Sequence, residues 1–188
     1  MARKNSVKER ILEVTSRLFY KQGFNSTGIN QIINEAGIAI GSLYKHFPSK
    51  NDLLYCYLQK QEEEYFRNLD SYFTNETLPL PKLLKLIDYR IEMQQKADYS
   101  GCHFVKINAE TGRQDKRINK LVLEHKRKQR SFINEIITEI SGAENLLMEK
   151  NTLANTIYLM IEGAVVCASI NGNTDDLKTV KKSVINLF

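Results

Sequence analysis

Residues 27–54 read Thr-Gly-Ile-Asn-Gln-Ile-Ile-Asn-Glu-Ala-Gly-Ile-Ala-Ile-Gly-Ser-Leu-Tyr-Lys-His-Phe-Pro-Ser-Lys-Asn-Asp-Leu-Leu, and this stretch decides the fold of the N-terminal part. Two short helical patterns meet at Gly37, where a turn needs a left-handed backbone that glycine adopts without steric cost. Apolar side chains on both sides supply a shared core, namely Ile29, Ile32, Ile33, Ile38 and Leu43. The pattern indicates a helix-turn-helix whose second helix keeps one face free for a DNA groove.

The run Gly-Ser-Leu-Tyr-Lys-His-Phe at 41–47, followed by Pro-Ser-Lys at 48–50, resembles the recognition helix of the TetR/AcrR family of bacterial transcriptional regulators. The resemblance implies a DNA-binding domain over residues 1–49. It also implies an effector-binding and dimerisation domain over residues 50–188. The expected function is that of a repressor, which binds a palindromic operator as a homodimer and is released by a small organic effector.

The positive charge of the chain lies in its N-terminal segment. Residues 1–50 contain eight Lys or Arg and three Glu, whereas the other 138 residues contain 19 side chains of each sign, so the first 50 residues carry the whole formal charge of +5. Positive side chains beside a helix-turn-helix neutralise phosphates and release counterions, which supplies affinity for any DNA sequence. Arg3 and Lys4 form a candidate arm for a groove, or an ordinary basic terminus.

Composition indicates a soluble globular protein. The chain has 188 residues, of which 42% are hydrophobic and 26% charged, and no apolar run approaches the ~20 residues that span a membrane. We expect a cytoplasmic protein without a membrane segment. The three cysteines, Cys56, Cys102 and Cys167, are widely spaced, which argues against a disulfide framework and a metal site. No cofactor is expected.

Helix boundaries are marked by capping patterns. Ser6 with Glu9 forms a capping box, and Gly23 is placed to end the first helix. Residues 25–27 offer side-chain caps for a second helix to about residue 35, and a third is expected over residues 39–47. Ser49 with Asp52 begins a long helix to about residue 73.

The C-terminal part continues as helices without any alternating strand pattern. Helices are expected over 83–97, 115–140 and 152–170, with a short apolar segment over 102–109. The sequence therefore predicts an all-α protein of about nine helices, with a three-helix DNA-binding domain followed by a helical domain.

The family motif identifies the candidate DNA contacts. Bases are contacted from the start of the recognition helix, while hydroxyl and cationic groups on either side hold phosphates. Two of the base-facing residues depart from the polar or cationic residues of many relatives, because Ala39 and Ile40 can touch a thymine methyl but cannot bond a base edge. Gly28 also departs from the usual β-branched or hydroxyl residue. The base-facing candidates are Ala39, Ile40, Gly41, Ser42 and Lys45, and the phosphate candidates are Thr27, Tyr44, His46 and Lys50.

A dimer is expected because one three-helix unit contacts too little DNA for high specificity. The apolar second half of the 115–140 helix and the 152–170 helix are the candidate interface, where Gly163, Ala164 and Ala168 allow close approach. The alternative is that these apolar stripes form the core of the monomer.

A second resemblance concerns the effector. Residues 100–110 with 162–168 are similar to TetR-type regulators of the LmrA/YxaF-like and NemR-like groups, which respond to drugs and to reactive electrophiles. A mostly apolar pocket with a few polar groups fits such a ligand. Each candidate has an alternative role in the core. The candidates are Phe66, Tyr89, Met93, Cys102, His103, Asn108, Tyr158 and Glu162.

Cys102 separates two mechanisms. In one it is an inert buried side chain beside a non-covalent ligand, and in the other an electrophile or oxidant modifies it. A reactive thiolate needs a nearby cation, for which Lys106 and His103 are candidates, whereas the 152–170 helix contains no lysine.

The alternative function classes are an enzyme and a non-specific DNA-binding protein. An enzyme is disfavoured because the chain has three histidines, no phosphate-binding glycine loop, no His-Glu-x-x-His and no Gly-x-Ser-x-Gly. A non-specific DNA-binding protein remains the other alternative. Such a protein would coat DNA uniformly, whereas a regulator would protect one palindrome, so footprinting distinguishes the two.

Overall fold

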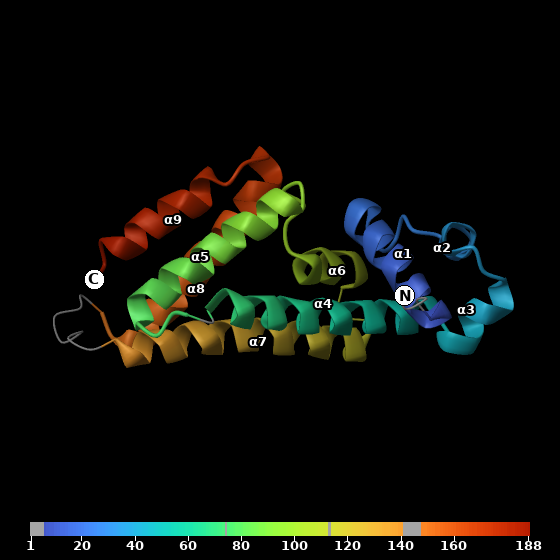
Figure 1. Ribbon diagram of the computed structural model, residues 1–188, viewed down its shortest axis with the longest axis horizontal. Helices are drawn as coiled ribbons and strands as arrows, with labels where there is room; N and C mark the ends of the chain where they lie inside the picture. Colours follow the sequence, from blue (N-terminus) through green and yellow to red (C-terminus); the bar gives the residue numbers. More distant parts are fainter. Residues whose placement is uncertain (1–5, 74, 113, 141–147) are drawn as a thin grey trace. The chain divides into compact units, whose positions relative to one another are not determined.

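The computed structural model describes residues 6–73, 75–112, 114–140 and 148–188, and this part of the chain forms nine helices and no strand (Figure 1). The predicted all-α fold is confirmed. Arg3 and Lys4 lie outside the described residues. The helices are α1 (Val7–Gln22), α2 (Ile29–Ala36), α3 (Ile40–His46), α4 (Lys50–Phe73), α5 (Pro79–Lys96), α6 (His103–Thr111), α7 (Lys116–Glu139), α8 (Lys150–Asn171) and α9 (Asp175–Ile185).

The chain folds into two compact units. Unit 1 comprises Met1–Glu63 and His103–Val122, and unit 2 comprises Glu64–Cys102 and Leu123–Phe188. The predicted domains divide the sequence at a single point, after residue 49. Unit 1 extends beyond that point and also contains α6 and the start of α7. Helices α1 to α3 therefore share a compact unit with a segment that follows them by more than fifty residues.

α1 begins and ends as its capping residues predict. The Ser6 hydroxyl accepts from the backbone N–H of Glu9 at 3.2 Å, and the Glu9 carboxylate accepts from the backbone N–H of Ser6 at 2.7 Å. This reciprocal pair satisfies two N–H groups that the first turn leaves without partners. At the other end Gly23 has φ 88°, and its N–H donates to the carbonyl of Phe19.

The helix-turn-helix has the predicted turn but a different cap. Gly37 is left-handed, with φ 59° and ψ 47°, and its N–H donates to carbonyls of the last turn of α2. The cap of α2 is Gly28, which has no side chain to accept a hydrogen bond, so the prediction of a side-chain cap from residues 25–27 was wrong. Glycine is tolerated as a helix cap at little cost.

The core of unit 1 includes apolar residues of the helix-turn-helix that the sequence predicted to be buried. Ile32, Ile33 and Leu43 are buried, whereas Ile29 and Ile38 are half-buried. α1 supplies the opposite side of this core. Its buried side chains are Ile11, Thr15, Leu18 and Phe19.

α4 begins where the second capping pattern predicted and α5 begins earlier than expected. The backbone N–H of Asp52 donates to the Ser49 hydroxyl at 3.0 Å. The expected helix began at residue 83, whereas α5 starts at Pro79 and contains Pro81 as well. Proline is accepted in the first turn of a helix because N–H groups there have no intrahelical acceptor.

Unit 2 is built around α8. Its buried side chains pack with those of α5 and α9 and with the later parts of α4 and α7. By length and composition α8 is the one described helix that could cross a membrane. That is weak evidence, since the core helix of a soluble protein has the same composition. The buried residues of α8 are Leu153, Ala154, Ile157, Tyr158, Ile161, Ala164, Val165 and Ala168.

Candidate functional site

The start of the recognition helix α3 is open to solvent. Ala39, Ile40, Gly41 and Lys45 are exposed, and Ser42 is half-buried. Leu43 points the other way and is fully buried, so packing of this one side chain orients α3 on the unit. All five base-facing candidates therefore belong to a single short helix and the residue before it.

Ile40 and Tyr44 give this surface its character. Ile40 is 55% exposed and Tyr44 is 45% exposed, on a helix that buries its other apolar side chain completely. Exposed apolar groups this large have no role in the core. An isoleucine at the first position of a recognition helix can contact a thymine methyl in the major groove.

The phosphate candidates divide into two groups. Tyr44 and His46 are exposed. Thr27, in contrast, is fully buried, and its Oγ1 donates to the carbonyl of Gly23 at 2.6 Å. The Thr27 hydroxyl thus serves the turn between α1 and α2.

Lys50 is also engaged by that turn. Its Nζ donates to the carbonyl of Phe24 at 2.7 Å and lies 4.2 Å from the centre of the Phe24 ring. Burial lowers the pKa of Lys50, although the negative charge of Glu110 opposes this shift. In this arrangement the Lys50 ammonium ties the start of α4 to the turn before α2.

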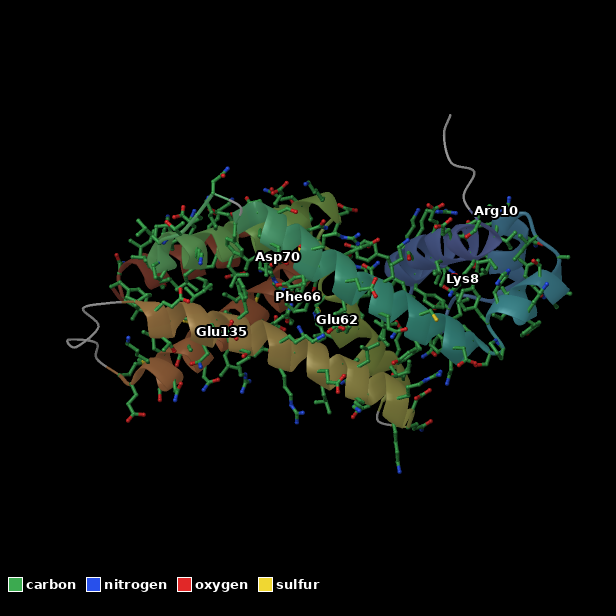
Figure 2. All side chains as sticks on the ribbon, turned by 60° about the horizontal axis from the view of Figure 1, so that its bottom comes forward. Lys8, Arg10, Glu62, Phe66, Asp70 and Glu135 are labelled. Carbon is green, nitrogen blue, oxygen red and sulfur yellow. The ribbon has the colours of Figure 1, made fainter. Side chains whose placement is uncertain are left out.

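Basic side chains also surround the DNA-binding helices. Lys8 and Arg10 project from α1 into solvent (Figure 2). Arg17 pairs with Glu35 at 2.5 Å, which joins α1 to α2. Among these groups the exposed lysine and arginine on α1 are those best placed to add general affinity for phosphates.

α6 contacts the turn between α1 and α2 through Glu110. The Glu110 carboxylate accepts from the backbone N–H of Asn25 at 2.7 Å, and its carbonyl accepts from the Asn25 side chain at 3.3 Å. A Cβ on Gly23 would lie 2.7 Å from Glu110 Oε1, so this approach requires glycine. The turn that precedes the helix-turn-helix is therefore held by a residue from the C-terminal half of the sequence.

The start of α6 packs on the end of α1. The His103 ring stacks on Tyr20 with centroids 4.3 Å apart, and its Nδ1 is hydrogen-bonded to the Tyr57 hydroxyl. Lys106 Nζ donates to the carbonyl of Tyr20 at 3.0 Å. Burial, followed by the charge of Lys106, lowers the pKa of His103 to about 4. His103 is therefore neutral at physiological pH.

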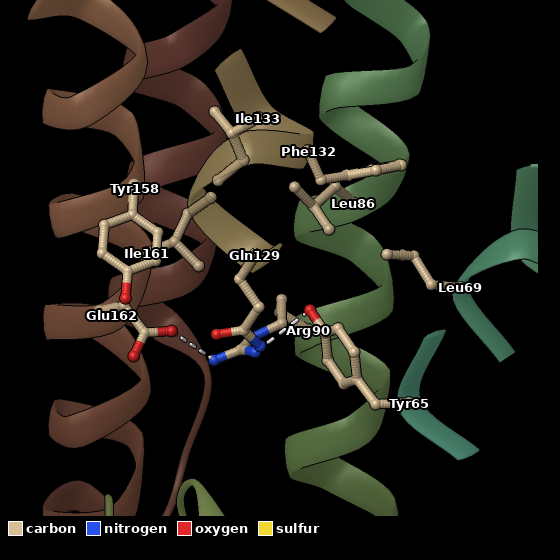
Figure 3. Close-up of a pocket in the computed structure, with 10 residues that line it drawn as sticks. All are labelled: Tyr65, Leu69, Leu86, Arg90, Gln129, Phe132, Ile133, Tyr158, Ile161 and Glu162. Atoms are coloured by element: carbon tan, nitrogen blue, oxygen red, sulfur yellow. Dashed lines mark hydrogen bonds and ion pairs between the residues drawn. The ribbon is translucent and has the colours of Figure 1, made fainter. Parts of the chain in front are cut away.

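Unit 2 contains a largely buried cluster of charges (Figure 3). The Glu162 carboxylate is shared, because Oε1 lies 3.0 Å from Arg90 Nη2 and Oε2 lies 2.5 Å from Lys126 Nζ. Lys126 also donates to Gln129 Oε1 at 3.1 Å and to Cys102 Sγ at 3.3 Å. One carboxylate thus faces two cations, with a thiol beside the second.

The cluster keeps its three ionisable members charged. Burial acts most strongly on the pKa of Glu162 and raises it, but Arg90 and Lys126 together bring it below its usual value. Burial likewise lowers the pKa of Lys126, and the nearby Cys102 and Glu162 more than reverse that effect. Burial also acts to lower the pKa of Arg90, but Tyr65, followed by Glu162, more than reverses this and raises it.

A small cavity adjoins this cluster. It has about 10 Å³ for the centres of water-sized molecules, which is room for one water. Of the eight pocket candidates, Tyr158 and Glu162 line it. The full lining is Tyr65, Leu69, Leu86, Arg90, Gln129, Phe132, Ile133, Tyr158, Ile161 and Glu162.

The other six pocket candidates lie elsewhere. Tyr89 and Met93 border a separate surface hollow on α4 and α5, and Phe66 packs edge-on against His125. Cys102 is in unit 2, beside Lys126. His103 and the exposed Asn108 belong to unit 1. The expected cation partners of Cys102 also differ, since Lys106 bonds to Tyr20 and the contact comes from Lys126 of α7.

Arg90, Lys126 and Gln129 were not among the residues predicted for the pocket. A usable signal was present in α5, where Leu83, Leu86 and Ile87 form a buried stripe that continues at Arg90. A charged residue at a core position of a helical repeat points to a buried partner. Gln129 lies on the buried stripe of α7 in the same way.

The apolar second half of α7 belongs to the core of unit 2. Ile133, Ile136 and Ile137 are buried, and Phe132 stacks on Phe73. These residues are not free for a partner subunit, so that part of the predicted interface was wrong and the alternative of a core role holds. α8 differs, because it buries one side and exposes Leu159, Val166 and Ile170 on another.

Two family models cover most of the chain. Residues 11–55 match the model of bacterial regulatory proteins of the tetR family, and residues 79–184 match the tetracyclin repressor-like C-terminal domain. The chain belongs to the TetR family. Its members are transcriptional regulators with a DNA-binding helix-turn-helix, which confirms the resemblance seen in the sequence and removes the enzyme alternative.

Individual relatives agree with this assignment. The HTH-type transcriptional regulator LmrA of Bacillus subtilis is 27% identical over 185 residues, which cover 96% of each chain. The reduced form of E. coli NemR has the same fold, with a TM-score of 0.79 at 21% identity over 97% of each chain. SCO4454, a TetR-family regulator from Streptomyces coelicolor, superposes with a TM-score of 0.87 at 20% identity, covering 99% of this chain and 90% of its own.

Proposed function

We propose that this TetR-family regulator is a repressor that binds a palindromic operator as a homodimer and leaves it when a small organic effector binds unit 2. The observation that carries the proposal is the exposed start of α3. Ile40, Tyr44 and Lys45 present apolar, aromatic and cationic groups to solvent on a helix that buried Leu43 holds in place. Such a surface suits base and phosphate contacts together.

The homodimer is supported by α8. Leu159, Gly163, Val166 and Ile170 follow at steps of four, three and four residues, so they share one face of the helix. Leu159 is 61% and Ile170 is 75% exposed, which is costly for side chains of this size in a monomer. The small Gly163 lets a second helix approach closely. A symmetric dimer would bury this face against its own copy.

Release is supported by the covalent link between Cys102 and the first residue of α6. The chain passes from unit 2 into unit 1 between Cys102 and His103, which is one of its three crossings between the units. Cys102 contacts Lys126 of the charge cluster, and α6 then holds the turn before α2 through Glu110. A ligand that shifts the cluster would move the chain at Cys102 and so pull on α6. The helix-turn-helix would then lose the orientation that suits two half-sites.

A second candidate mechanism uses Cys102 itself. The Lys126 ammonium 3.3 Å from Cys102 Sγ supplies the cation that a reactive thiolate requires. In this mechanism an electrophile or oxidant modifies the sulfur and breaks its contact with Lys126. The same path through α6 would weaken operator binding.

Footprinting on DNA upstream of the gene and its neighbours tests the proposal. A discrete palindromic footprint with two equal halves supports an operator-binding dimer. Uniform protection of all DNA would mean a non-specific binding protein. Titration of the footprinted complex with a thiol-reactive electrophile, with wild type beside Cys102→Ser, separates the two release mechanisms, since release of both proteins alike excludes Cys102 as the switch.

A further inference from the structure

The charge cluster of unit 2 carries one positive charge more than its partners neutralise. Arg90 and Lys126 share the single carboxylate of Glu162, and both oxygens of that carboxylate are used. Arg90 is 5% exposed, so solvent does little to stabilise it. Among the described residues that line the adjoining cavity, Glu162 is the one acidic side chain. A buried net charge is costly unless a counter-charge is supplied.

The same cavity has a hydrogen-bond donor without an acceptor. Gln129 is 5% exposed, and its Nε2 is buried with no hydrogen-bond partner. The orientation of this amide is fixed, because its oxygen accepts from Lys126 at 3.1 Å. Figure 3 shows the Gln129 amide and the Arg90 guanidinium side by side at the polar end of the cavity. That end therefore offers positive charge and an unpaired N–H group, and its Tyr65 hydroxyl already accepts from Arg90 at 3.3 Å.

The rest of the cavity wall is apolar. It consists of Leu69, Leu86, Phe132, Ile133 and Ile161, with the Tyr65 and Tyr158 rings at its sides. The present volume of about 10 Å³ admits one water, so a larger apolar group must displace a side chain. Phe132 suits this role because it is only partly buried, whereas Ile133 and Ile161 are core residues.

We infer that the effector of this site is a monocarboxylate with an apolar body. Its carboxylate would bind between Arg90 and Gln129 Nε2, and its apolar part would replace the Phe132 ring against Leu69 and Leu86. The inference rests on the proposed function, since it names the class of ligand for the same site. It follows from the excess positive charge, the unpaired donor and the apolar wall, which meet in one cavity.

Cys102 offers the competing source of negative charge. A thiolate beside Lys126 would balance the cluster without any ligand. The cavity itself is lined by Arg90 and Gln129, not by Cys102, so a thiolate there would leave Gln129 Nε2 without an acceptor. The two sources therefore predict different behaviour toward added anions.

The experiment compares ligands of equal shape and different charge on the full-length protein. Acetate, butyrate and benzoate are each tested beside the matching neutral amide, and benzoate also beside benzamidine, at constant ionic strength. Thermal unfolding and the affinity for the operator are both measured. We expect at least one carboxylate to raise the melting temperature and weaken operator binding, because a ligand that binds the folded state stabilises it. The neutral and cationic partners should do neither.

Two variants of one residue sharpen the test. Gln129→Glu places a carboxylate beside Lys126 and Arg90, so it should melt above wild type and lose the response to the carboxylate. Gln129→Leu removes the donor but adds no charge, and it should bind the carboxylate roughly tenfold or more weakly than wild type. Circular dichroism confirms that both variants fold. If one variant does not fold, the ligand series on the wild-type protein still tests the inference.

Several results would overturn the inference. One is an amide that raises the melting temperature as much as the matching carboxylate does, and another is no response to any carboxylate. The third is a response that appears only in Cys102→Ala, which would mean that the thiolate holds the counter-charge. Failure of the proposed function looks different, because the protein would then show no discrete operator footprint at all. A footprint that no carboxylate affects would leave the repressor intact and remove only this ligand class.

Discussion

The Lys126 ammonium donates to the Cys102 sulfur across 3.3 Å while the same nitrogen lies 2.5 Å from the Glu162 carboxylate. These two contacts make Cys102 chemically different from the other two cysteines. Cys56 and Cys167 are also half-buried, but no such cation contact is seen at either within the described part of the chain. A nearby cation is a feature of the surroundings of reactive cysteines.

We therefore expect iodoacetamide to alkylate Cys102 faster than Cys56 or Cys167, and we expect Lys126→Gln to remove this advantage. Mass spectrometry of peptides from one time course measures all three sites, so Cys56 and Cys167 serve as references within the same molecule. Unchanged alkylation of Cys102 in Lys126→Gln would show that the contact does not activate the sulfur.

Ile40 should determine a preference for thymine. Replacing Ile40 with Ala shortens the side chain that reaches the methyl group, at a cost of ~1 kcal/mol or more if the contact exists. Operators in which single thymines are replaced by deoxyuracil lack only that methyl. Wild type should discriminate between the two bases at one position of each half-site, and Ile40→Ala should not. Equal discrimination by both proteins would place Ile40 away from the base.

Tyr44 and Lys50 should separate affinity from stability. Tyr44→Phe removes an exposed hydroxyl, so we expect weaker binding to matched and scrambled duplexes alike with unchanged unfolding. Lys50→Met loses the bond to the Phe24 carbonyl and the contact with its ring, which should lower the free energy of unfolding by about 1 kcal/mol. Urea denaturation and fluorescence anisotropy measure the two quantities. If Lys50→Met is as stable as wild type, the contacts of Lys50 with Phe24 do not stabilise the fold, and a direct phosphate contact becomes the better explanation of this residue.

The stability of the protein should decrease as the pH is lowered, because of His103. Its pKa is about 4 in the folded protein, against an ordinary value of 6.5. Between these values the unfolded chain binds a proton that the folded chain does not, so stability decreases as the pH falls from about 6.5 to 4, by 1–3 kcal/mol in order of magnitude. His103→Gln should flatten the curve of unfolding free energy in this window. A curve that keeps its slope would assign the loss to other groups.

The dimer should depend on α8 and not on α7. Ile170→Asp introduces a charge into the exposed apolar face of α8, whereas Leu123→Asp does so at an exposed position of α7. Sedimentation at micromolar concentration should give a dimer for wild type and Leu123→Asp. Ile170→Asp should give the 21.7 kDa monomer. If Ile170→Asp remains a dimer and Leu123→Asp becomes a monomer, the interface lies on α7 and the prediction is wrong.

Local patterns in the sequence predicted the helix boundaries well, because these depend on nearby residues. The Ser6 and Glu9 pair and the glycines at 23 and 37 act within one or two turns, so their effect is visible in the sequence itself. The exposed face of α3 followed from the same local logic. Once Leu43 is recognised as a core residue, the opposite face of a short helix must be exposed.

The effector region was harder to predict because its contacts are distant in the sequence. Arg90, Lys126 and Glu162 come from three helices, and their pairing depends on how α5, α7 and α8 pack. Periodicity identifies a buried position but does not say which buried charges meet. The role of α7 shows the same limit, since an apolar stripe looks alike whether it faces the core or a partner.

The contact between Gly23 and Glu110 has a genetic consequence. Any side chain at position 23 must adopt φ 88° and displace the carboxylate that holds Asn25, yet it leaves the exposed face of α3 intact. Under the proposed release through α6, a bacterium with such a substitution would keep its operator occupied in the presence of inducer. Non-inducible mutants selected on this basis should gather at positions 23, 25 and 110, which belong neither to the proposed base contacts nor to the proposed effector site.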